Sequence, residues 1–203
     1  HPAFLVVAEA SGAVFFAAHD GYRGRELWRS DLEPESVSET GAGTALVLDI
    51  RPGQEGSDPH HLYAVRNASL LASSPTGEWV FFSADDGAHG RELWLSDGTA
   101  AGTGLVLDLN PGPHGSNPAG FVEFAGVVFF AATDDTWGRE LWRTDGTAGG
   151  TFRVVDLARG ARSTSPMLLT AFADHLYFVA EVASPWVYGP GRVVLWVSDG
   201  TAA

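Results

Sequence analysis

The sequence contains neither cysteine nor lysine. The absence of cysteine excludes disulfides and thiolate metal sites, so packing must hold the fold together. Apart from histidine, all basic side chains are arginines, of which there are twelve, and the formal net charge is −13. A protein of this charge repels nucleic acid and anionic membrane surfaces, and we expect neither as a partner.

Long apolar runs and known catalytic motifs are also missing. No stretch approaches the roughly 18 apolar residues of a membrane-spanning helix, so we expect no insertion into a membrane. There is no HExxH zinc motif and no GxSxG nucleophile motif, and the glycine-rich stretch 98–104 lacks the lysine of a phosphate-binding loop. His60 and His61 are adjacent and should point to opposite sides of a strand, which makes them a poor chelating pair.

Glycine and proline are abundant instead. Twenty-five glycines and eleven prolines fall between short apolar runs, a punctuation typical of all-β chains. With 203 residues, of which 45% are apolar, the chain is long enough to bury one sizeable core. We therefore expect strands and no helices.

One phrase recurs along the chain. Residues 80–103 align with 128–151 without a gap, with about two thirds of the positions identical, and related phrases begin at Val14 and Leu176. The same place in the four copies is held by Trp28, Trp94, Trp142 and Trp196. A period of 40 to 50 residues with four short strands is typical of β-propeller blades. The sequence thus predicts an all-β protein, a β-propeller of about four four-stranded blades, with repeat units near 1–58, 59–117, 118–165 and 166–203.

Four kinds of strand are expected in a unit, as at 127–130, 139–145, 151–157 and, after a Pro-Gly loop, 120–124. Such short strands are marginal alone, so the units should stack and bury Leu141 on one face and Trp142 on the other. We assign 120–124, and the similar start of the chain, as the last strand of a blade. The total is then fifteen strands, one fewer than four blades need.

Three arrangements are compatible with this strand count. They are a four-bladed ring with an incomplete blade, a larger ring formed by two chains, and a piece of a longer array. The last is favoured, and we expect self-association through the incomplete blade near Trp196, because an open sheet leaves backbone groups unpaired.

The phrases GRELWRSD, GRELWLSDGTAAGT, GRELWRTDGTAGGT and VVLWVSDGTAA resemble the bacterial ELWxxDGT repeat family. The resemblance covers essentially the whole chain and implies an exported, propeller-like array, secreted or at the cell surface. It brings no established catalytic residues. The first unit departs from the pattern because no Gly-Thr follows Asp31, and the fourth because Val193 and Val194 replace the Arg-Glu pair.

The charged residues that repeat with the motif are expected to be structural. Each Arg-Glu pair should bridge neighbouring strands or blades, because adjacent residues of a strand face opposite sides. These pairs contain Glu26, Glu92 and Glu140. The aspartates of the DGT turns should accept hydrogen bonds from turn backbone. These are Asp97, Asp145 and Asp199.

The loop between the first two strands of each copy is the candidate site. Its opening aspartates, expected to cap the turn with calcium binding as the alternative, are Asp20, Asp86 and Asp134. Variable loop tips on a constant scaffold commonly bind ligands, and aromatic rings suit sugars and peptides, although such rings also pack over neighbouring loops. The candidate ligand-binding residues are Tyr22, Arg23, His89, Trp137, Trp186 and Tyr188.

These features predict a binding or surface-scaffold module without enzyme activity, whose partner is a protein or glycan ligand. The first alternative is a carbohydrate-binding lectin, with or without calcium. The second is a propeller glycosidase or lyase, because the sequence does not give the separation of its carboxylates.

Overall fold

The computed structural model describes residues 3–9, 11–31, 43–66, 70, 73–155, 157, 163–182 and 192–201. These residues form fifteen strands, all paired antiparallel, which confirms the all-β class and the expected number of strands. Leu70 is the one described residue in a helical conformation, although no helix was expected. In this part of the chain, no helix is long and apolar enough to span a membrane.

The strands form four sheets, each built from consecutive strands in sequence order. Sheet 1 contains β1 (Ala3–Val7), β2 (Val14–His19), β3 (Arg25–Ser30) and β4 (Thr44–Leu48). Sheet 2 contains β5 (His60–Ala64), β6 (Val80–Asp85), β7 (Arg91–Ser96) and β8 (Gly104–Leu107). Sheet 3 contains β9 (Ala119–Phe124), β10 (Val127–Asp134), β11 (Gly138–Thr144) and β12 (Phe152–Val155). Sheet 4 contains β13 (Met167–Phe172), β14 (His175–Val182) and β15 (Arg192–Ser198).

The prediction that 120–124 is the last strand of a blade is wrong, because it is the first strand of its sheet. It lies in β9, which pairs with the following strand β10, as in the pair Phe124 and Val127. The reason is the short turn between them, in which Ala125 and Gly126 have φ of 50° and 80°, a conformation that closes a hairpin. The start of the chain likewise pairs with β2 and belongs to sheet 1, and sheet 4 has three strands.

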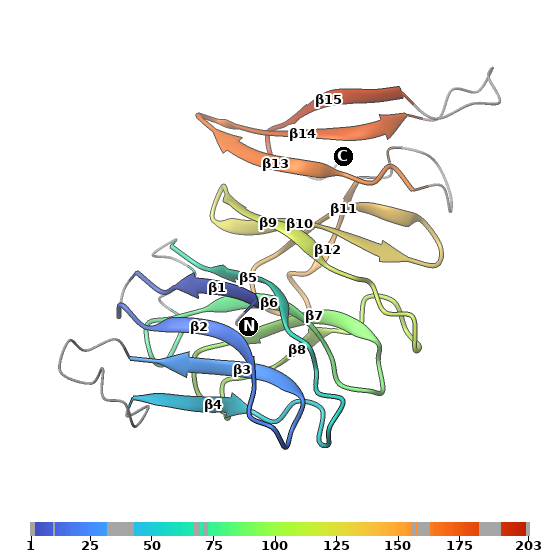
Figure 1. Cartoon of the computed structure of the whole chain (residues 1–203). Coiled ribbons are helices and arrows are strands. Elements are labelled where there is room, and N and C mark those ends of the chain that lie inside the picture. Colours follow the sequence, from blue (N-terminus) through green and yellow to red (C-terminus); the bar gives the residue numbers. More distant parts are fainter. Residues whose placement is uncertain are drawn as a thin grey trace.

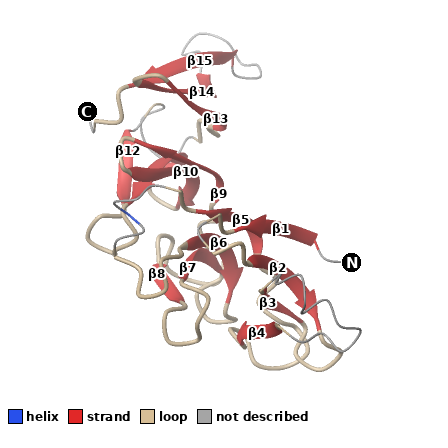
Figure 2. Ribbon diagram, turned by 90° about the vertical axis from the view of Figure 1, so that its left-hand side faces the viewer, coloured by secondary structure: helices blue, strands red, loops and turns tan. Residues whose placement is uncertain are grey.

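The sheets follow one another in an open row, with sheet 1 at one end and sheet 4 at the other (Figures 1 and 2). Their first strands contact one another in sequence order, β1 with β5, β5 with β9 and β9 with β13. This succession of antiparallel sheets, with the first strands gathered together, is the arrangement of neighbouring propeller blades.

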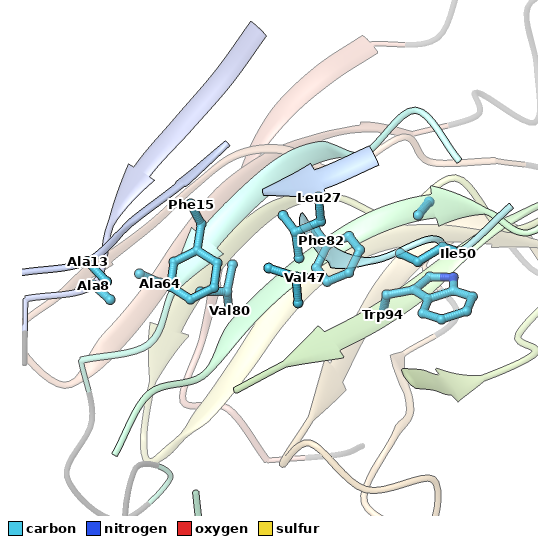
Figure 3. Packing of buried hydrophobic residues seen from close by; sticks show 11 residues of the cluster. Ala8, Ala13, Phe15, Leu27, Val47, Ile50, Ala64, Val80, Phe82 and Trp94 are labelled. Carbon is cyan, nitrogen blue, oxygen red and sulfur yellow. The ribbon is translucent and has the colours of Figure 1, made fainter. Parts of the chain in front are cut away.

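The three interfaces between sheets are built in the same way. On the front face of sheets 1 to 3, turned to the next sheet, a leucine of the third strand is fully buried; on the back face of sheets 2 to 4, a tryptophan of the third strand packs against the previous sheet. Leu27 of sheet 1 thus lies in one cluster with Phe82 and Trp94 of sheet 2 (Figure 3). Leu141 and Trp142 belong to two different clusters, which confirms that they point to opposite sides.

The two ends of the row leave apolar faces uncovered. Leu195, on the front face of sheet 4, is 66% exposed, whereas Leu141 at the same place in sheet 3 is fully buried. Its neighbours Val193 and Val197 are also exposed. At the other end, Leu5 of β1 is 60% exposed on the back face of sheet 1. These faces are apolar like the internal interfaces, but no described residue covers them.

A buried carboxylate in sheet 2 fixes the loop that leads to sheet 3. Glu92 of β7 is fully buried and accepts hydrogen bonds at 2.5–3.1 Å from the N–H groups of Leu109, Asn110 and Ser116 and from the Ser116 hydroxyl. Burial raises the pKa of Glu92, and these hydrogen bonds oppose the shift.

The repeated glutamates of sheets 1 and 3 have the same role. Glu26 and Glu140 are also fully buried and accept hydrogen bonds from the loop that follows their own sheet. The donors to the two carboxylates are the N–H groups of Ile50, Arg51 and Ser57, the Ser57 hydroxyl, the N–H of Leu157 and the Thr164 hydroxyl. The expected structural role of these glutamates is therefore confirmed. Their hydrogen-bond partners are groups of a loop, however, and not the side chain of an arginine.

The DGT turns cap themselves and also cover the preceding sheet. Asp97 accepts hydrogen bonds from the Thr99 N–H at 2.9 Å and from the Thr99 hydroxyl at 2.7 Å, and Asp145 and Asp199 make the same contacts. Gly98 has φ of 87°, and a Cβ added to it would press against Phe15 of sheet 1. The turn of one sheet thus seals the core of the sheet before it.

Replacing Glu92 by glutamine should destabilise the protein. The glutamine side chain has one acceptor oxygen where the carboxylate has two, and its NH₂ group would point at N–H donors. Some of these buried donors would be left unpaired, which should lower the free energy of unfolding by about 1–3 kcal/mol. Urea denaturation measures this loss. The control is Glu9→Gln, because Glu9 is exposed and pairs with Arg66 at the surface, and its change should stay within about 0.5 kcal/mol. Equal stability of the two variants would contradict the role assigned to Glu92.

Candidate functional site

Close backbone contacts bring two sets of loops together at one end of the sheets. A Cβ on Gly24 would overlap the backbone of Gly56, and one on Gly90 would overlap the backbone of Gly115. The hairpin loops β2–β3 and β6–β7 therefore lie beside the connections between sheets, and after the β10–β11 loop the Arg139 N–H donates to the Ser163 hydroxyl of the next connection. We call the surface formed by these hairpin loops and by residues 49–59 and 108–118 the loop face; it contains the predicted tip residues Tyr22, Arg23, His89 and Trp137.

The aspartates that open the hairpin loops cap their own turns. Asp20 accepts hydrogen bonds from the N–H groups of Tyr22 and Arg23 at 2.8 and 2.9 Å, and these bonds lower the pKa of Asp20. Asp86 and Asp134 accept the equivalent bonds in their loops. Among the described residues, no group of three or more His, Asp or Glu side chains could hold a metal ion. The contacts thus match the capping role, and the aspartates lie in separate loops.

The first two predicted tips differ in exposure. Tyr22 is 82% exposed, so its ring is free of packing over neighbouring loops. Arg23 turns back to Asp20, with 2.6 Å between Nη1 and Oδ2. His89 does the same, because its Nδ1 lies 2.7 Å from Asp86 Oδ2, and this hydrogen bond raises the pKa of His89. Of these three side chains, only the tyrosine is presented whole to a ligand.

Trp137 combines exposure with a fixed orientation. Its side chain is 37% exposed, and the guanidinium carbon of Arg153 lies 4.1 Å from the centre of the ring. A cation over one face of an indole stabilises the ring position and leaves the other parts available for contact. Trp186 and Tyr188, the other two predicted aromatic residues, lie outside the described residues.

A pocket that the sequence analysis missed lies between sheets 2 and 3. It has a volume of about 150 Å³ and is lined by His60, His61, Arg91, Asn117 and Pro118. The expectation that the two imidazoles point apart is wrong, because their ring centres are 6.3 Å apart and both line the pocket. The only sequence signal was that this His-His pair does not recur in the other copies.

A bulge at the start of β5 explains why the two histidines meet. The pairing with β6 shifts register between His60 and Tyr63, and His61 has φ of 55°. Strict alternation of side chains fails at such a bulge. The residues at the same place in the next two sheets, Gly120 and Leu168, also have positive φ, so the bulge is a repeated property of the first strand.

Arginines of the third strands reach toward this pocket from two sheets. Arg91 donates from Nη1 to the carbonyl oxygens of Asp58 and Ser83, at 2.7 and 3.2 Å. Arg139 donates to the carbonyl oxygens of Asn117 and Ala131, at 2.8 and 3.2 Å. Each guanidinium therefore lies across the edge of its own sheet, near the beginning of the first strand.

Positive charge exceeds negative charge around the pocket. The Asp58 carboxylate oxygens lie 3.7 Å from Arg25 Nη1, 3.3 Å from Arg91 Nη2 and 3.5 Å from His60 Nδ1. No ion pair of Arg139 is found in the described part of the chain. Burial, followed by the positive charges of His60, Arg139 and Arg91, lowers the pKa of His61. In a protein of net charge −13, this is a local cationic site.

No known family model matches the sequence, and no curated protein sequence matches it. Solved structures are similar in fold. A crystal structure of puromycin hydrolase has a TM-score of 0.54 at 14% identity, and the match covers 94% of this chain and 26% of the hydrolase. A mutant of that hydrolase complexed with PGG has a TM-score of 0.52 at 16% identity, covering 88% of this chain and 25% of the other.

A structure from a study of two prolyl endopeptidases is similar to the same degree. Its TM-score is 0.52 at 14% identity, and the match covers 96% of this chain and 26% of the endopeptidase. This chain thus spans about a quarter of the length of these proteins, which contain a β-propeller. At these identities the likeness concerns the fold alone.

Calcium should leave the stability of the protein unchanged. The Asp20, Asp86 and Asp134 carboxylates already accept backbone hydrogen bonds and are not gathered into one group, so we expect the melting temperature to be the same with millimolar calcium and with chelator. Differential scanning calorimetry measures it. A rise of the melting temperature with calcium, lost in Asp86→Asn, would instead support a metal site in the hairpin loops.

Proposed function

We propose that this chain is a binding or surface-scaffold module of the β-propeller type, without enzyme activity. The observation that carries the proposal is the division of roles in the repeat. The repeated glutamates and DGT aspartates hold loops and turns, and Trp94, Trp142 and Trp196 pack at the sheet interfaces. Variation is left to the loop face and to the two uncovered ends. The resemblance to the ELWxxDGT repeat family supports the same proposal and a place outside the cell.

We further propose that the uncovered end faces bind each other between copies of this chain. The front face of sheet 4 is equivalent to the faces that are buried in the three internal interfaces, and the back face of sheet 1 is equivalent to their partners. Leu195 of one copy would then lie against Leu5 and Trp28 of a second copy. Such a head-to-tail contact closes into a ring or continues as an array.

Sedimentation tests the association of the end faces. Wild-type protein should sediment as dimers or larger species whose fraction rises with concentration, and Leu195→Glu should be monomeric because the glutamate would be buried unpaired in the contact. The control is Tyr22→Glu, which places the same charge on an exposed side chain of a hairpin loop instead of an end face. Since both positions are exposed, both variants should fold. A wild-type monomer at all concentrations would exclude this contact.

The exposed rings favour a sugar ligand as the specific form of the binding function. Tyr22 and Trp137 lie on the loop face, and the Arg153 side chain orients the indole. Apolar faces of sugar rings stack on such side chains. A lectin-like function is therefore the candidate that these residues support.

Glycan and peptide arrays test this binding. We expect wild-type protein to retain a defined set of ligands, Trp137→Ala to lose them, and Trp137→Phe to keep them in part because a ring remains. Thermal melting shows that the variants are folded. If wild-type protein retains no ligand, or if Trp137→Ala binds as the wild type does, the loop tips are not the ligand site.

A further inference from the structure

The pocket between sheets 2 and 3 is formed by residues that depart from the repeat. His60 and His61 occupy positions that are Ala119 and Gly120 in the next sheet, although the bulge that brings them together is common to both sheets. Residues needed for the framework recur in every copy. An unrepeated pair of imidazoles at a repeated bulge is therefore not explained by the packing of the sheets.

Negative charge near the pocket is lost from one sheet to the next. Two residues before the first strand of sheets 2, 3 and 4, the chain has a residue with positive φ. This residue is Asp58, Asn117 and Ser165 in turn, so a carboxylate is present only before sheet 2. The side chains of Arg91 and Arg139 donate to the carbonyl oxygens of Asp58 and Asn117, and the Arg25 side chain also lies near the Asp58 carboxylate. Two guanidinium groups, those of Arg25 and Arg91, thus pair with the single carboxylate of Asp58, whereas Arg139 lies at the Asn117 carbonyl, where the carboxylate is replaced by an amide.

We infer that the pocket lined by His60, His61 and Arg91 binds the carboxylate group of a small acidic ligand. The inference rests on the proposed binding function and names the class of ligand for one site on the loop face. A guanidinium has five N–H groups in one plane, which match the two oxygens of a carboxylate. Arg91 uses some of them for the Asp58 and Ser83 carbonyl groups, and this fixes the orientation of its side chain.

The size and charge of the pocket favour a small anionic group. At about 150 Å³ it is smaller than the roughly 300 Å³ at which drug-sized sites begin, so it accommodates a terminal group or a single small molecule. A divalent cation would be repelled by Arg91 and Arg139, since like charges in a half-buried site are unfavourable. The carboxylate of an acidic sugar and the carboxylate at the end of a peptide both meet these requirements of size and charge.

Binding of a carboxylate should be coupled to protonation of His61. The charged groups that face it are His60, Arg91, Arg139 and, with opposite sign, Asp58. The pKa of His61 is below its usual range in the free protein, and a bound anion stabilises the imidazolium form and raises it. The complex therefore takes up protons, and affinity should increase as the pH falls from about 7.5 to about 5.5.

Titration calorimetry with matched pairs of probes tests the inference. The acidic probes are glucuronate and N-acetylglycine, and their neutral counterparts are glucose and N-acetylglycinamide. We expect saturable binding of at least one acidic probe, stronger at lower pH, and none of the neutral ones. The tighter acidic probe distinguishes the sugar source from the peptide source of the carboxylate.

The decisive variant replaces the imidazoles by the residues that sheet 3 already carries. His60→Ala combined with His61→Gly preserves the backbone, because Gly120 adopts positive φ at the same bulge, and it should lower the affinity by about tenfold or more. His175→Ala, in sheet 4, is the control and should bind as the wild type does. Unchanged binding in the double variant, binding of the neutral probes, or absence of carboxylate binding would overturn the inference. Tight zinc binding lost in the double variant would overturn it as well.

These outcomes are separable from those of the proposed function. Array binding depends on Trp137 and end-to-end association depends on Leu195, and neither residue lines this pocket. If the array and sedimentation results are positive while the carboxylate probes fail, only the ligand assigned to this pocket is wrong. Failure of the array experiment with carboxylate binding intact would instead restrict the binding function to the pocket.

Discussion

The arrangement of the sheets depends on one interaction, the buried carboxylate of the third strand. A carboxylate without water must be compensated by donors, and Glu92 obtains them from the backbone of the connection to the next sheet. The donors cannot be supplied unless that connection takes one path. The carboxylate therefore determines where the following sheet begins, and repetition of the glutamate at positions 26 and 140 repeats the same step along the row.

The rest of the motif completes the interface that this step prepares. The leucine after each glutamate is buried toward the next sheet, and the tryptophan after it packs toward the previous sheet where there is one. The DGT turn then covers the phenylalanine core of the previous sheet. One short stretch thus contains the glutamate that fixes the connection, the leucine and tryptophan of the two apolar faces, and the turn that covers the previous sheet. The motif recurs because each interface requires all four parts, and sheet 4 shows the consequence, since its Leu195 has no neighbouring sheet and is exposed.

Features that arise from repetition were predictable from the sequence, whereas departures of the backbone from regular strands were not. Spacing and alternation of side chains predicted fifteen strands and opposite faces for Leu141 and Trp142. They did not predict the position of β9, because a turn of only two residues, Ala125 and Gly126, barely interrupts the largely apolar run from Phe121 to Phe130. The meeting of His60 and His61 was missed for the same kind of reason. A bulge changes the side to which a residue points, and a non-glycine residue with positive φ is not visible in an alternating pattern.

Repetition also indicates where function should be sought in such a molecule. A residue that recurs in every sheet is explained by the interface that every sheet makes, and its charge is no sign of catalysis. Glu92 is buried and has a raised pKa, two properties typical of catalytic acids, yet its hydrogen bonds are entirely internal. The informative residues are those that change while their backbone stays the same. Asp58 against Asn117 and His61 against Gly120 are such changes, and both occur around one pocket. A framework that repeats its stabilising residues leaves these positions free to vary without loss of the fold.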